Sequence, residues 1–412
     1  MKRILHCLAQ LPTRTGSGVY YHNLVCHVGQ QPDWQQAALY AVPFGESVDW
    51  LPTDLHFPVC FDTSDLPFPI AGMSDEMPYP STVYHRMDET QLTAWRAAFR
   101  AQLQEARRRF RPDIVICHHL WLLARLVLDV FGDIPVIGIS HGTDIRQARQ
   151  NPAMCAREVG SLRRLARVLA LSEHHLDELC ACFDLQPEQI VVTGGAIDTS
   201  RFFPDGARRA RGPAEPVRLV YAGKMARAKG TYELIEAFGL ARAADPHLSL
   251  DLIGRIPPAL AAHIEAVGGT AAPIRIFDLE SQAHFAEHLR RLDVFVFPSY
   301  FEGLGLVALE ALASGLSLVA NRLPPLLGQL GPRLSADPAV AWVDLPRLHG
   351  VDKIDPSERG AYIDRLAAAI LRQAAYSRDP AAVSAHPYRE LADHSWQRLS
   401  RRVLDLADQL MD

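Results

Sequence analysis

The sequence lacks the charge imbalance and the cysteine pairing that would place it in a specialised class. Its 412 residues carry 42 Lys and Arg against 47 Asp and Glu, a formal net charge of −5, so a nucleic acid is not expected as the main partner. The seven cysteines are an odd number, and the one close pair, Cys180 and Cys182, has no second pair to complete a zinc site. A disulfide scaffold and a zinc domain are therefore disfavoured, and a reducing, cytoplasmic setting fits best.

A long uncharged hydrophobic run is also missing. The stretch from Gly303 to Ala320 is nearly continuous apolar sequence, but Glu310 lies in its middle, and a carboxylate at the centre of a bilayer costs several kcal/mol. A buried helix beside a strand is the better interpretation, so no transmembrane segment is expected. The apolar stretch behind Met1 is short and carries His6, which favours a first strand over a signal peptide. We expect a cytoplasmic protein, with a peripheral location at the inner membrane face as the alternative.

A strand, loop and helix pattern occurs at the start of each half of the chain. It covers residues 3–9, 12–18 and 19–28 in the first half and 217–222, 223–230 and 231–238 in the second. Further β-rich runs alternate with helical segments, at 113–117, 135–140, 168–171 and 190–193, and at 248–253, 274–277, 294–297 and 316–320. This alternation predicts the α/β class, with a doubly wound parallel sheet in each half.

The length and one polar stretch predict how the chain divides. A chain of 412 residues suits two domains, and the polar residues from Pro204 to Pro213 are bounded by helix breakers. We predict an N-terminal domain over 1–203, a linker over 204–216, a C-terminal domain over 217–385 and a C-terminal helical segment over 386–412. The Pro-rich residues 62–82 predict a long loop that either overhangs a cleft or is a plain surface connection.

Two loops of the first half follow predicted strands, where open parallel sheets bind their ligands. Gly16 and Gly18 let the backbone approach a ligand and leave N–H groups available at a helix start, although a simple tight turn uses the same residues. His141 follows the strand over 135–140 and can donate to a sugar hydroxyl or a leaving oxygen. A capping role for Ser140 or Asp144, with a merely packed His141, is the competing interpretation.

The loop over 223–230 joins the first strand and helix of the second half. It places Lys224, Arg227 and Lys229 beside backbone donors. This arrangement favours a diphosphate-binding loop over the alternative, in which the three cations are solvated surface side chains. The loop has neither the Gly-x-Gly-x-x-Gly pattern of dinucleotide enzymes nor a Walker phosphate loop. A phosphate site of another kind is therefore predicted.

Two glutamates stand eight positions apart after the strand over 294–297. If Glu302 lies in a loop and Glu310 on the following helix, about two helical turns separate them and both can face one ligand. Carboxylates accept paired hydrogen bonds from vicinal hydroxyls, such as those of a sugar and a ribose. A capping glutamate plus a surface glutamate is the alternative, but Glu310 is embedded in apolar sequence and needs a partner.

These segments resemble the glycosyltransferase family 4 group, whose members are retaining enzymes of the GT-B fold. Residues 302–310 are similar to its Glu-x7-Glu motif. The sequence that usually flanks this motif is matched by Phe297-Pro298-Ser299 before it and by Gly315 after it. The loop over 223–230 resembles the family's Gly-Arg-x4-Lys-Gly loop, with Lys224 where arginine is usual. Residues 193–202 are similar to its Asn-Gly-Val-Asp-x-x-Arg-Phe stretch, with Gly194 in place of asparagine.

The resemblance implies two Rossmann-like domains that face a central cleft, with the C-terminal helix crossing back to the N-terminal domain. It implies that Lys224 and Lys229 hold the donor diphosphate, Glu302 the sugar hydroxyls and Glu310 the ribose. The further expected donor contacts are Gly16, Gly18, Gly223, Gly303, Leu304 and Gly305. The expected catalytic residues are His141, Lys224, Lys229 and Glu302, and the acceptor-side candidates are Asp144 and Tyr79.

The implied activity is that of a retaining hexosyl- or glycosyltransferase (EC 2.4) in glycan biosynthesis, with a nucleotide-diphosphate sugar as co-substrate. No Asp-x-Asp pair lies near a candidate donor loop, so we expect no metal and no other cofactor. The acceptor is open among lipid, glycan, peptide and small metabolite. Residues 321–326 depart from the family's Gly-Gly-x-Pro-Glu segment, which leaves the sugar contacts there open. A silent nucleotide-sugar-binding protein and a nucleotide-sugar epimerase are the alternatives.

Overall fold

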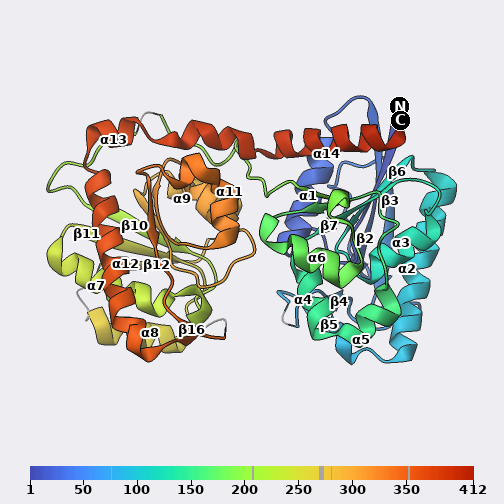
Figure 1. Cartoon of the computed structure of the whole chain (residues 1–412), viewed down its shortest axis with the longest axis horizontal. Coiled ribbons are helices and arrows are strands. Elements are labelled where there is room, and N and C mark those ends of the chain that lie inside the picture. The colour runs from blue at the N-terminus through green and yellow to red at the C-terminus, as the bar shows by residue number, and fades with distance from the viewer. Residues whose placement is uncertain (76, 207, 269–272, 280, 351–352) are drawn as a thin grey trace. The chain divides into compact units, whose positions relative to one another are not determined.

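The chain folds into two compact units (Figure 1). The first consists of Met1–Gly194 and Trp396–Asp412, and the second of Gly195–Ser395. The computed structural model describes residues 1–75, 77–206, 208–268, 273–279, 281–350 and 353–412. Positions 76, 207, 269–272, 280 and 351–352, which belong to the predicted loop, linker and C-terminal domain, therefore lie outside the described residues.

A parallel sheet forms the centre of the first unit. Its seven strands, counted over the described residues, run in the order β3 (Leu55–Phe61), β2 (Trp34–Pro43), β1 (Lys2–Cys7), β6 (Ile114–His118), β7 (Val136–Ser140), β8 (Arg167–Ala170) and β9 (Ile190–Val192). The strand order reverses between β1 and β6, which pair in the register Ile4 to Ile114 and Cys7 to Cys117. Parallel sheets bind ligands at such a switch point, beyond the carboxyl ends of the strands.

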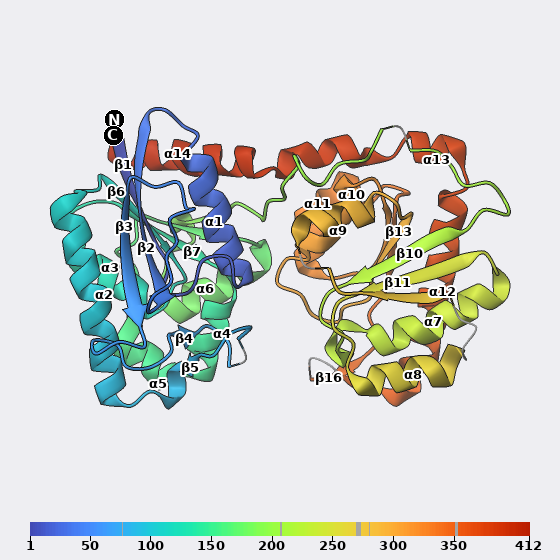
Figure 2. The same cartoon turned by 180° about the vertical axis from the view of Figure 1, so that it is seen from behind.

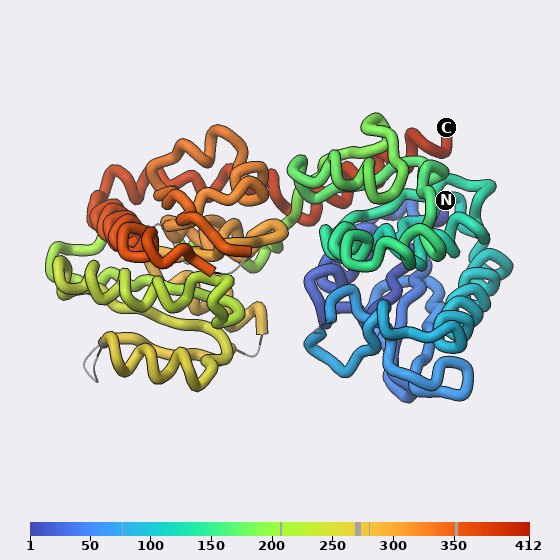
Figure 3. The backbone as a smooth tube through the Cα atoms, turned by 60° about the horizontal axis from the view of Figure 1, so that its bottom comes forward, coloured from blue at the N-terminus to red at the C-terminus, as the bar shows by residue number. Residues whose placement is uncertain are grey.

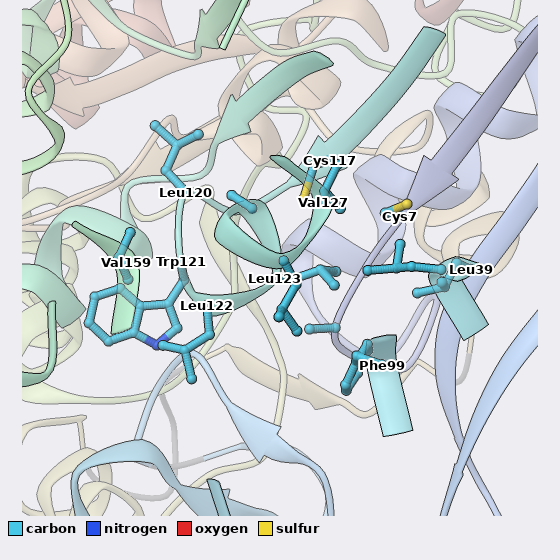
Figure 4. Close-up of a cluster of buried hydrophobic side chains, with 14 of the residues drawn as sticks. Cys7, Leu39, Phe99, Cys117, Leu120, Trp121, Leu122, Leu123, Val127 and Val159 are labelled. Atoms are coloured by element: carbon cyan, nitrogen blue, oxygen red, sulfur yellow. The ribbon is translucent and has the colours of Figure 1, made fainter. Parts of the chain in front are cut away.

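Helices cover both faces of this sheet. They are α1 (Gly16–Val28), α2 (Glu89–Arg109), α3 (Leu122–Val130), α4 (Thr143–Gln150), α5 (Pro152–Met154), α6 (Leu176–Phe183) and α14 (Trp396–Met411). α2 and α3 pack on one face, where Phe99, Leu123 and Val127 meet Cys7 and Cys117 of the strands (Figure 4). α1 packs on the other face (Figure 2). Its Tyr21 and Val25 side chains there join a core cluster with Ala38 and Tyr40 of β2.

The described part of residues 62–82 is mainly a loop, as the sequence predicts, but several of its apolar side chains are buried. Phe68 and Met73 are buried in the core of the first unit, and the segment leads into a short parallel pair, β4 (Ala71–Gly72) and β5 (Thr82–Val83). Met77 packs so closely on Gly72 that a β-carbon there would lie 2.3 Å from its Cγ. The described part of this segment is therefore more than a plain surface connection, because several of its apolar side chains contribute to the core.

The second unit also has a central parallel sheet. In the described residues it contains six strands in the order β12 (Ile274–Phe277), β11 (Leu248–Ile253), β10 (Val217–Ala222), β13 (Val294–Phe297), β14 (Ser317–Asn321) and β15 (Val340–Val343). Strand residues alternate between the two faces, so Leu219 and Tyr221 join one core cluster and Val220 and Ala222 the other. The order reverses between β10 and β13, which makes this the switch point of the second sheet.

Helices again cover the two faces of this second sheet. They are α7 (Thr231–Ala244), α8 (Pro258–Gly268), α9 (Gln282–Leu289), α10 (Leu306–Ala313), α11 (Pro324–Ser335), α12 (Pro356–Tyr376) and α13 (Pro380–Ser384), and a small hairpin pairs β16 (Leu348–His349) with β17 (Lys353–Ile354). α7 and α12 lie side by side on one face (Figure 3). α9, α10 and α11 pack on the other face. Together these structures show the GT-B class of architecture, two units that each hold a Rossmann-like sheet.

The two units divide at Gly194 and Gly195, earlier in the chain than the predicted linker over 204–216. The Gly195 amide donates to the Gln329 side chain at 3.0 Å, and Phe202 is buried in the second core. Within the predicted linker, the Arg211 guanidinium lies 2.8 Å from the Asp293 carboxylate, and Arg208 is also paired with Asp293. These contacts tie the described part of residues 204–216 to the second unit.

The C-terminal helix α14 belongs to the first unit although it follows the second in the chain. The Trp396 ring contacts the Tyr20 ring of α1 edge-on at 4.8 Å, and the Arg402 side chain donates to the Val192 carbonyl at 3.2 Å. Lys2 and Asp408 form an ion pair of 2.5 Å between β1 and α14. No helix among the described residues combines the length and apolar composition needed to cross a membrane.

Candidate functional site

A pocket of about 440 Å³ opens at the switch point of the second sheet. The loops that follow β10 and β13 supply its charged residues, Lys224, Lys229 and Glu302. These two strands are neighbours, so their carboxyl ends lie at the same edge of the sheet. Of the residues expected to contact a donor, the pocket is lined by Gly223, Lys224, Lys229, Glu302 and Gly305. The structure therefore brings together, in one cavity, residues that stand about eighty positions apart in the chain.

Lys229 and Glu302 form the polar centre of this pocket. The Lys229 Nζ lies 2.6 Å from Glu302 Oε1 and donates to the Phe301 carbonyl at 3.2 Å. Their side chains are 26% and 18% exposed, so the pair is partly shielded but still open to a ligand. Lys224, on the same loop, is exposed and lines the same cavity. A cation and a carboxylate side by side suit a ligand that combines phosphate with hydroxyl groups.

The two loops are locked together by a backbone contact that requires glycine. Gly230 has φ +65°, and a β-carbon on it would lie 2.2 Å from the Pro298 carbonyl oxygen. The Tyr300 amide donates to the Ala228 carbonyl at 3.0 Å, and the Tyr300 hydroxyl donates to the buried Glu233 at 2.8 Å. These contacts hold the Lys229 loop against the Glu302 loop.

Asn321, where the chain departs from the family pattern, stabilises the loop after β13 that carries Glu302. It ends β14, is fully buried, and its side-chain amide donates to the carbonyls of Pro298 and Ser299 at 2.9 and 3.0 Å. Its side-chain oxygen accepts the Tyr362 hydroxyl at 3.0 Å. Asn321 therefore stabilises the turn after β13, and its side chain faces the protein interior.

Glu310 lies one helical turn beyond the pocket. It does not line the cavity, but Leu306 and Val307 do, and residues three and four apart lie on the same helix face. Burial raises the pKa of Glu310 to about 8, while nearby Arg201 lowers it and Asp198 raises it. A strongly raised pKa in a half-buried carboxylate is typical of a functional site.

Of the other predicted donor contacts next to Glu302, which are Gly303, Leu304 and Gly305, only Gly305 lines the pocket. Gly303 is exposed, with open space around its α-carbon, and Leu304 does not line the pocket. Leu304 and Leu306 lie against Gly195, where a β-carbon would come within 2.5 Å of the Leu306 side chain. Gly305 has φ +73° and begins α10, whose first amides point toward the pocket end of the helix.

Sequence reasoning missed one wall of this pocket. Its apolar residues are Ile253 at the end of β11 and Leu279 and Phe285 after β12, and its polar residues are Ser281 and Gln282. Gln282 is held by the Arg201 guanidinium at 3.0 Å, and Arg201 is in turn paired with Asp198. Inspection of the residues that follow every predicted strand, including the one over 274–277, could have found them.

In the first unit, the predicted loop lies at the corresponding switch point after β1. Thr15 caps α1 by accepting the Gly18 amide at 3.0 Å, and a β-carbon on Gly18 would lie 2.7 Å from the Leu11 carbonyl oxygen. Gly16 has open space around its α-carbon, so a ligand can approach the backbone there. Neither glycine lines the pocket of the second unit.

His141 and Asp144 lie after β7 and have different surroundings. Asp144 is fully buried, and its carboxylate accepts hydrogen bonds from the Ser140 hydroxyl at 2.8 Å, the Leu120 amide at 3.1 Å and the His141 amide at 3.3 Å. These bonds fix the turn between β7 and α4, although the N-cap residue of α4 is Gly142 and, among the described residues, no side chain caps that helix. His141 is half-buried, and burial lowers its pKa well below the ordinary value, so its ring is neutral at physiological pH.

Tyr79 lies on the segment over 62–82 and is half-buried. Its hydroxyl is near the Leu11 main chain, which places it beside the loop that carries Gly16. Burial raises the pKa of the Tyr79 hydroxyl, so it stays protonated and can donate. The structure therefore groups Tyr79 with the loop after β1.

Comparison with known proteins gives matches in both halves of the chain. Residues 70–201 match the family "Glycosyltransferase Family 4", and residues 216–331 match "Glycosyl transferases group 1". Glycogen synthase of Mycobacterium tuberculosis H37Rv is 30% identical over 243 residues, 55% of this chain and 56% of that protein. D-inositol 3-phosphate glycosyltransferase of Arthrobacter sp. FB24 is 28% identical over 275 residues, 61% of this chain and 64% of that protein. The chain thus spans less than two thirds of these relatives.

Solved structures agree with the fold over nearly the whole chain. Sucrose-phosphate synthase from Thermosynechococcus elongatus superimposes with a TM-score of 0.66 at 17% identity, covering 100% of this chain and 99% of that one. UDP-GlcNAc 2-epimerase from Neisseria meningitidis reaches 0.57 at 13% identity, covering 98% of both chains. At these identities the likeness shows the fold alone, which both transferases and epimerases use.

The fold and the pocket thus define a GT-B protein with a site at the switch point of its second sheet. The two family matches place it more narrowly: the chain belongs to the group 1, family 4 glycosyltransferases.

Proposed function

We propose that the protein is a retaining glycosyltransferase that moves a sugar from a nucleoside-diphosphate sugar, bound in the pocket of the second unit, to an acceptor. The observation that carries this proposal is the convergence of Lys224, Lys229 and Glu302 in one cavity, with Glu310 one turn beyond on α10. The group 1 family match over residues 216–331 covers all four residues.

Each of these residues has a role that its chemistry suits. Lys224 and Lys229 bind the diphosphate and stabilise the charge that develops on it as the sugar leaves, which is the main catalytic effect we assign. Glu302 accepts hydrogen bonds from the sugar hydroxyls and Glu310 from the ribose. We assign charge neutralisation to the lysines and to the first amides of α10, and propose that no metal is needed.

The acceptor side of the proposal rests on the first unit. Gly16, His141 and Tyr79 follow its strands or lie beside the loop after β1, which is where a parallel sheet binds its ligand. His141 is proposed to contribute a neutral hydrogen-bond donor. The acceptor itself is a lipid, glycan, peptide or small metabolite. We also propose a cytoplasmic location, consistent with seven free thiols, with the inner membrane face as the alternative.

Incubation with a panel of nucleotide sugars and acceptors, in the presence of a chelator, tests this function. We expect release of nucleoside diphosphate that depends on an acceptor, and a product whose anomeric configuration, read by NMR, equals that of the donor. Inversion would contradict the retaining assignment, and activity that appears only with added divalent metal would contradict metal independence. Conversion of the donor sugar without any acceptor would favour the epimerase, and binding without turnover the silent binding protein.

A further inference from the structure

Buried histidines surround His141 at the switch point of the first sheet. His118 ends β6, and its Nδ1 lies 3.2 Å from the Nε2 of His141, with the two rings nearly parallel at 16°. His118 is fully buried, and His119 is 3% exposed with its ring centroid 4.7 Å from that of His141. The ring of His141 is therefore held by a neighbouring histidine rather than by a carboxylate.

Both rings of this hydrogen-bonded pair are neutral. Burial lowers the pKa of His118 and of His141, and each has another histidine nearby whose charge would lower it further. A neutral imidazole carries one N–H and one bare nitrogen. The 3.2 Å contact therefore joins an N–H of one ring to the lone pair of the other, and the tautomer of His118 determines that of His141.

The surroundings of His118 favour one of the two arrangements. Its Nε2 is buried and has no hydrogen-bond partner among the described residues. The centroids of the Tyr20 and Tyr21 rings lie 5.9 and 5.1 Å from the centroid of the His118 ring. Buried N–H groups without an acceptor are rarer in proteins than acceptors that go unused. The proton of His118 is therefore better placed on Nδ1, where it has His141 as its acceptor.

We propose that His118 is a positioning residue that donates from Nδ1 to the Nε2 of His141 and so leaves His141 with its own proton on Nδ1. His141 then donates a hydrogen bond through its Nδ1–H while its ring stays neutral. The Asp144 carboxylate fixes its backbone amide at 3.3 Å, so the ring and the main chain are held from two sides. That the oxygen receiving this hydrogen bond belongs to a sugar or a phosphate rests on the proposed function.

Nitrogen-15 NMR of the full chain with labelled histidine tests the tautomer directly, without any assay of transfer. His141→Gln and His118→Asn spectra assign the two rings. We expect a protonated Nδ1 and a bare Nε2 for His141 in the wild type, and a mixed or reversed pattern in His118→Leu. His118→Asn should restore the wild-type pattern, because its amide N–H can occupy the place of Nδ1–H. A wild-type His141 protonated on Nε2, or one unchanged in His118→Leu, would overturn the proposal.

Kinetics provide the second readout. We expect kcat to fall at least about tenfold in His118→Leu, with the KM for the nucleotide sugar little changed and with substantial recovery in His118→Asn. His386→Leu is the control, because His386 is also buried but lies in the second unit, where its Nε2 is 2.9 Å from the Leu316 carbonyl oxygen. An equal loss in His386→Leu, or no recovery in His118→Asn, would reduce His118 to a packing role. Absence of transfer in the wild type would refute the proposed function but leave the NMR test of the tautomer intact.

Discussion

Replacing Glu302 by glutamine is expected to separate the binding of nucleoside diphosphate from sugar transfer. In the ligand-free protein the Lys229 ammonium is paired with Glu302 at 2.6 Å, so the lysine assigned to the diphosphate is already neutralised by the carboxylate assigned to the sugar. Glutamine keeps the shape of the side chain but removes this competing charge. We expect the affinity for nucleoside diphosphate, measured by calorimetry, to be unchanged or several-fold tighter, while kcat falls by about 10²–10³-fold.

The control for this prediction is Glu287→Gln. Glu287 lies on α9 of the same unit, forms an exposed ion pair with Arg291 and does not line the pocket, so its loss should change neither quantity. A parallel loss of diphosphate affinity and of turnover in Glu302→Gln would mean that Glu302 supports the diphosphate site, and the competition described for Lys229 would be wrong.

Nucleotide binding is expected to depend on pH through Glu310. Burial raises its pKa to about 8 in the free protein, whereas a carboxylate that accepts hydrogen bonds from a ribose is favoured in its charged form. Binding must then release a proton below pH 8. We expect the affinity for nucleoside diphosphate to fall by up to about tenfold for each pH unit below this value and to be level above it. The diphosphate and the lysines still titrate in Glu310→Gln. Subtracting the pH dependence of its affinity from that of the wild type therefore isolates the contribution of the Glu310 carboxyl group.

The same group predicts a pH dependence of stability, with a definite sign. Its folded-state pKa of about 8 lies above the ordinary value of 4.5, so the stability that the protonated form contributes is fully present below pH 4.5 and is lost as the pH rises through about 8. In thermal unfolding, the melting temperature of Glu310→Gln minus that of the wild type should increase from pH 5 to pH 8 and stay constant above pH 8. A difference in melting temperature that is the same at all pH values would show that Glu310 is ionised throughout.

Much of the second unit could be predicted from the sequence because its strands are short, nearly continuous apolar runs. β10, β11, β12 and β13 begin and end at the predicted residues, and the loops after β10 and β13 contain the polar residues of the pocket. A buried parallel strand between turn residues is the pattern that sequence reading detects best. The order of strands then places these loops at one switch point.

Other features depended on which strands become neighbours, and a single sequence does not show that. The Lys229–Glu302 pair joins residues from the loops after β10 and β13, and the His118–His141 contact joins the ends of β6 and β7. β2 and β3 were not predicted, and Pro58 inside β3 is tolerated because β3 is an edge strand. The burial of Phe68 and Met73 was not predicted, because the prolines of residues 62–82 indicate a loop and do not show which of its side chains are buried.

The central claim is that the pocket of the second unit binds a nucleoside diphosphate and its sugar conjugate. Thermal unfolding of the purified chain with a panel of nucleoside diphosphates and nucleotide sugars, in a chelator, tests it most directly, since a ligand that binds only the folded state raises the melting temperature. We predict a rise for one nucleotide family that is lost in Lys229→Ala and in Glu310→Ala, each measured against its own ligand-free melting temperature. No rise with any nucleotide, or a rise that both variants retain in full, would contradict the account.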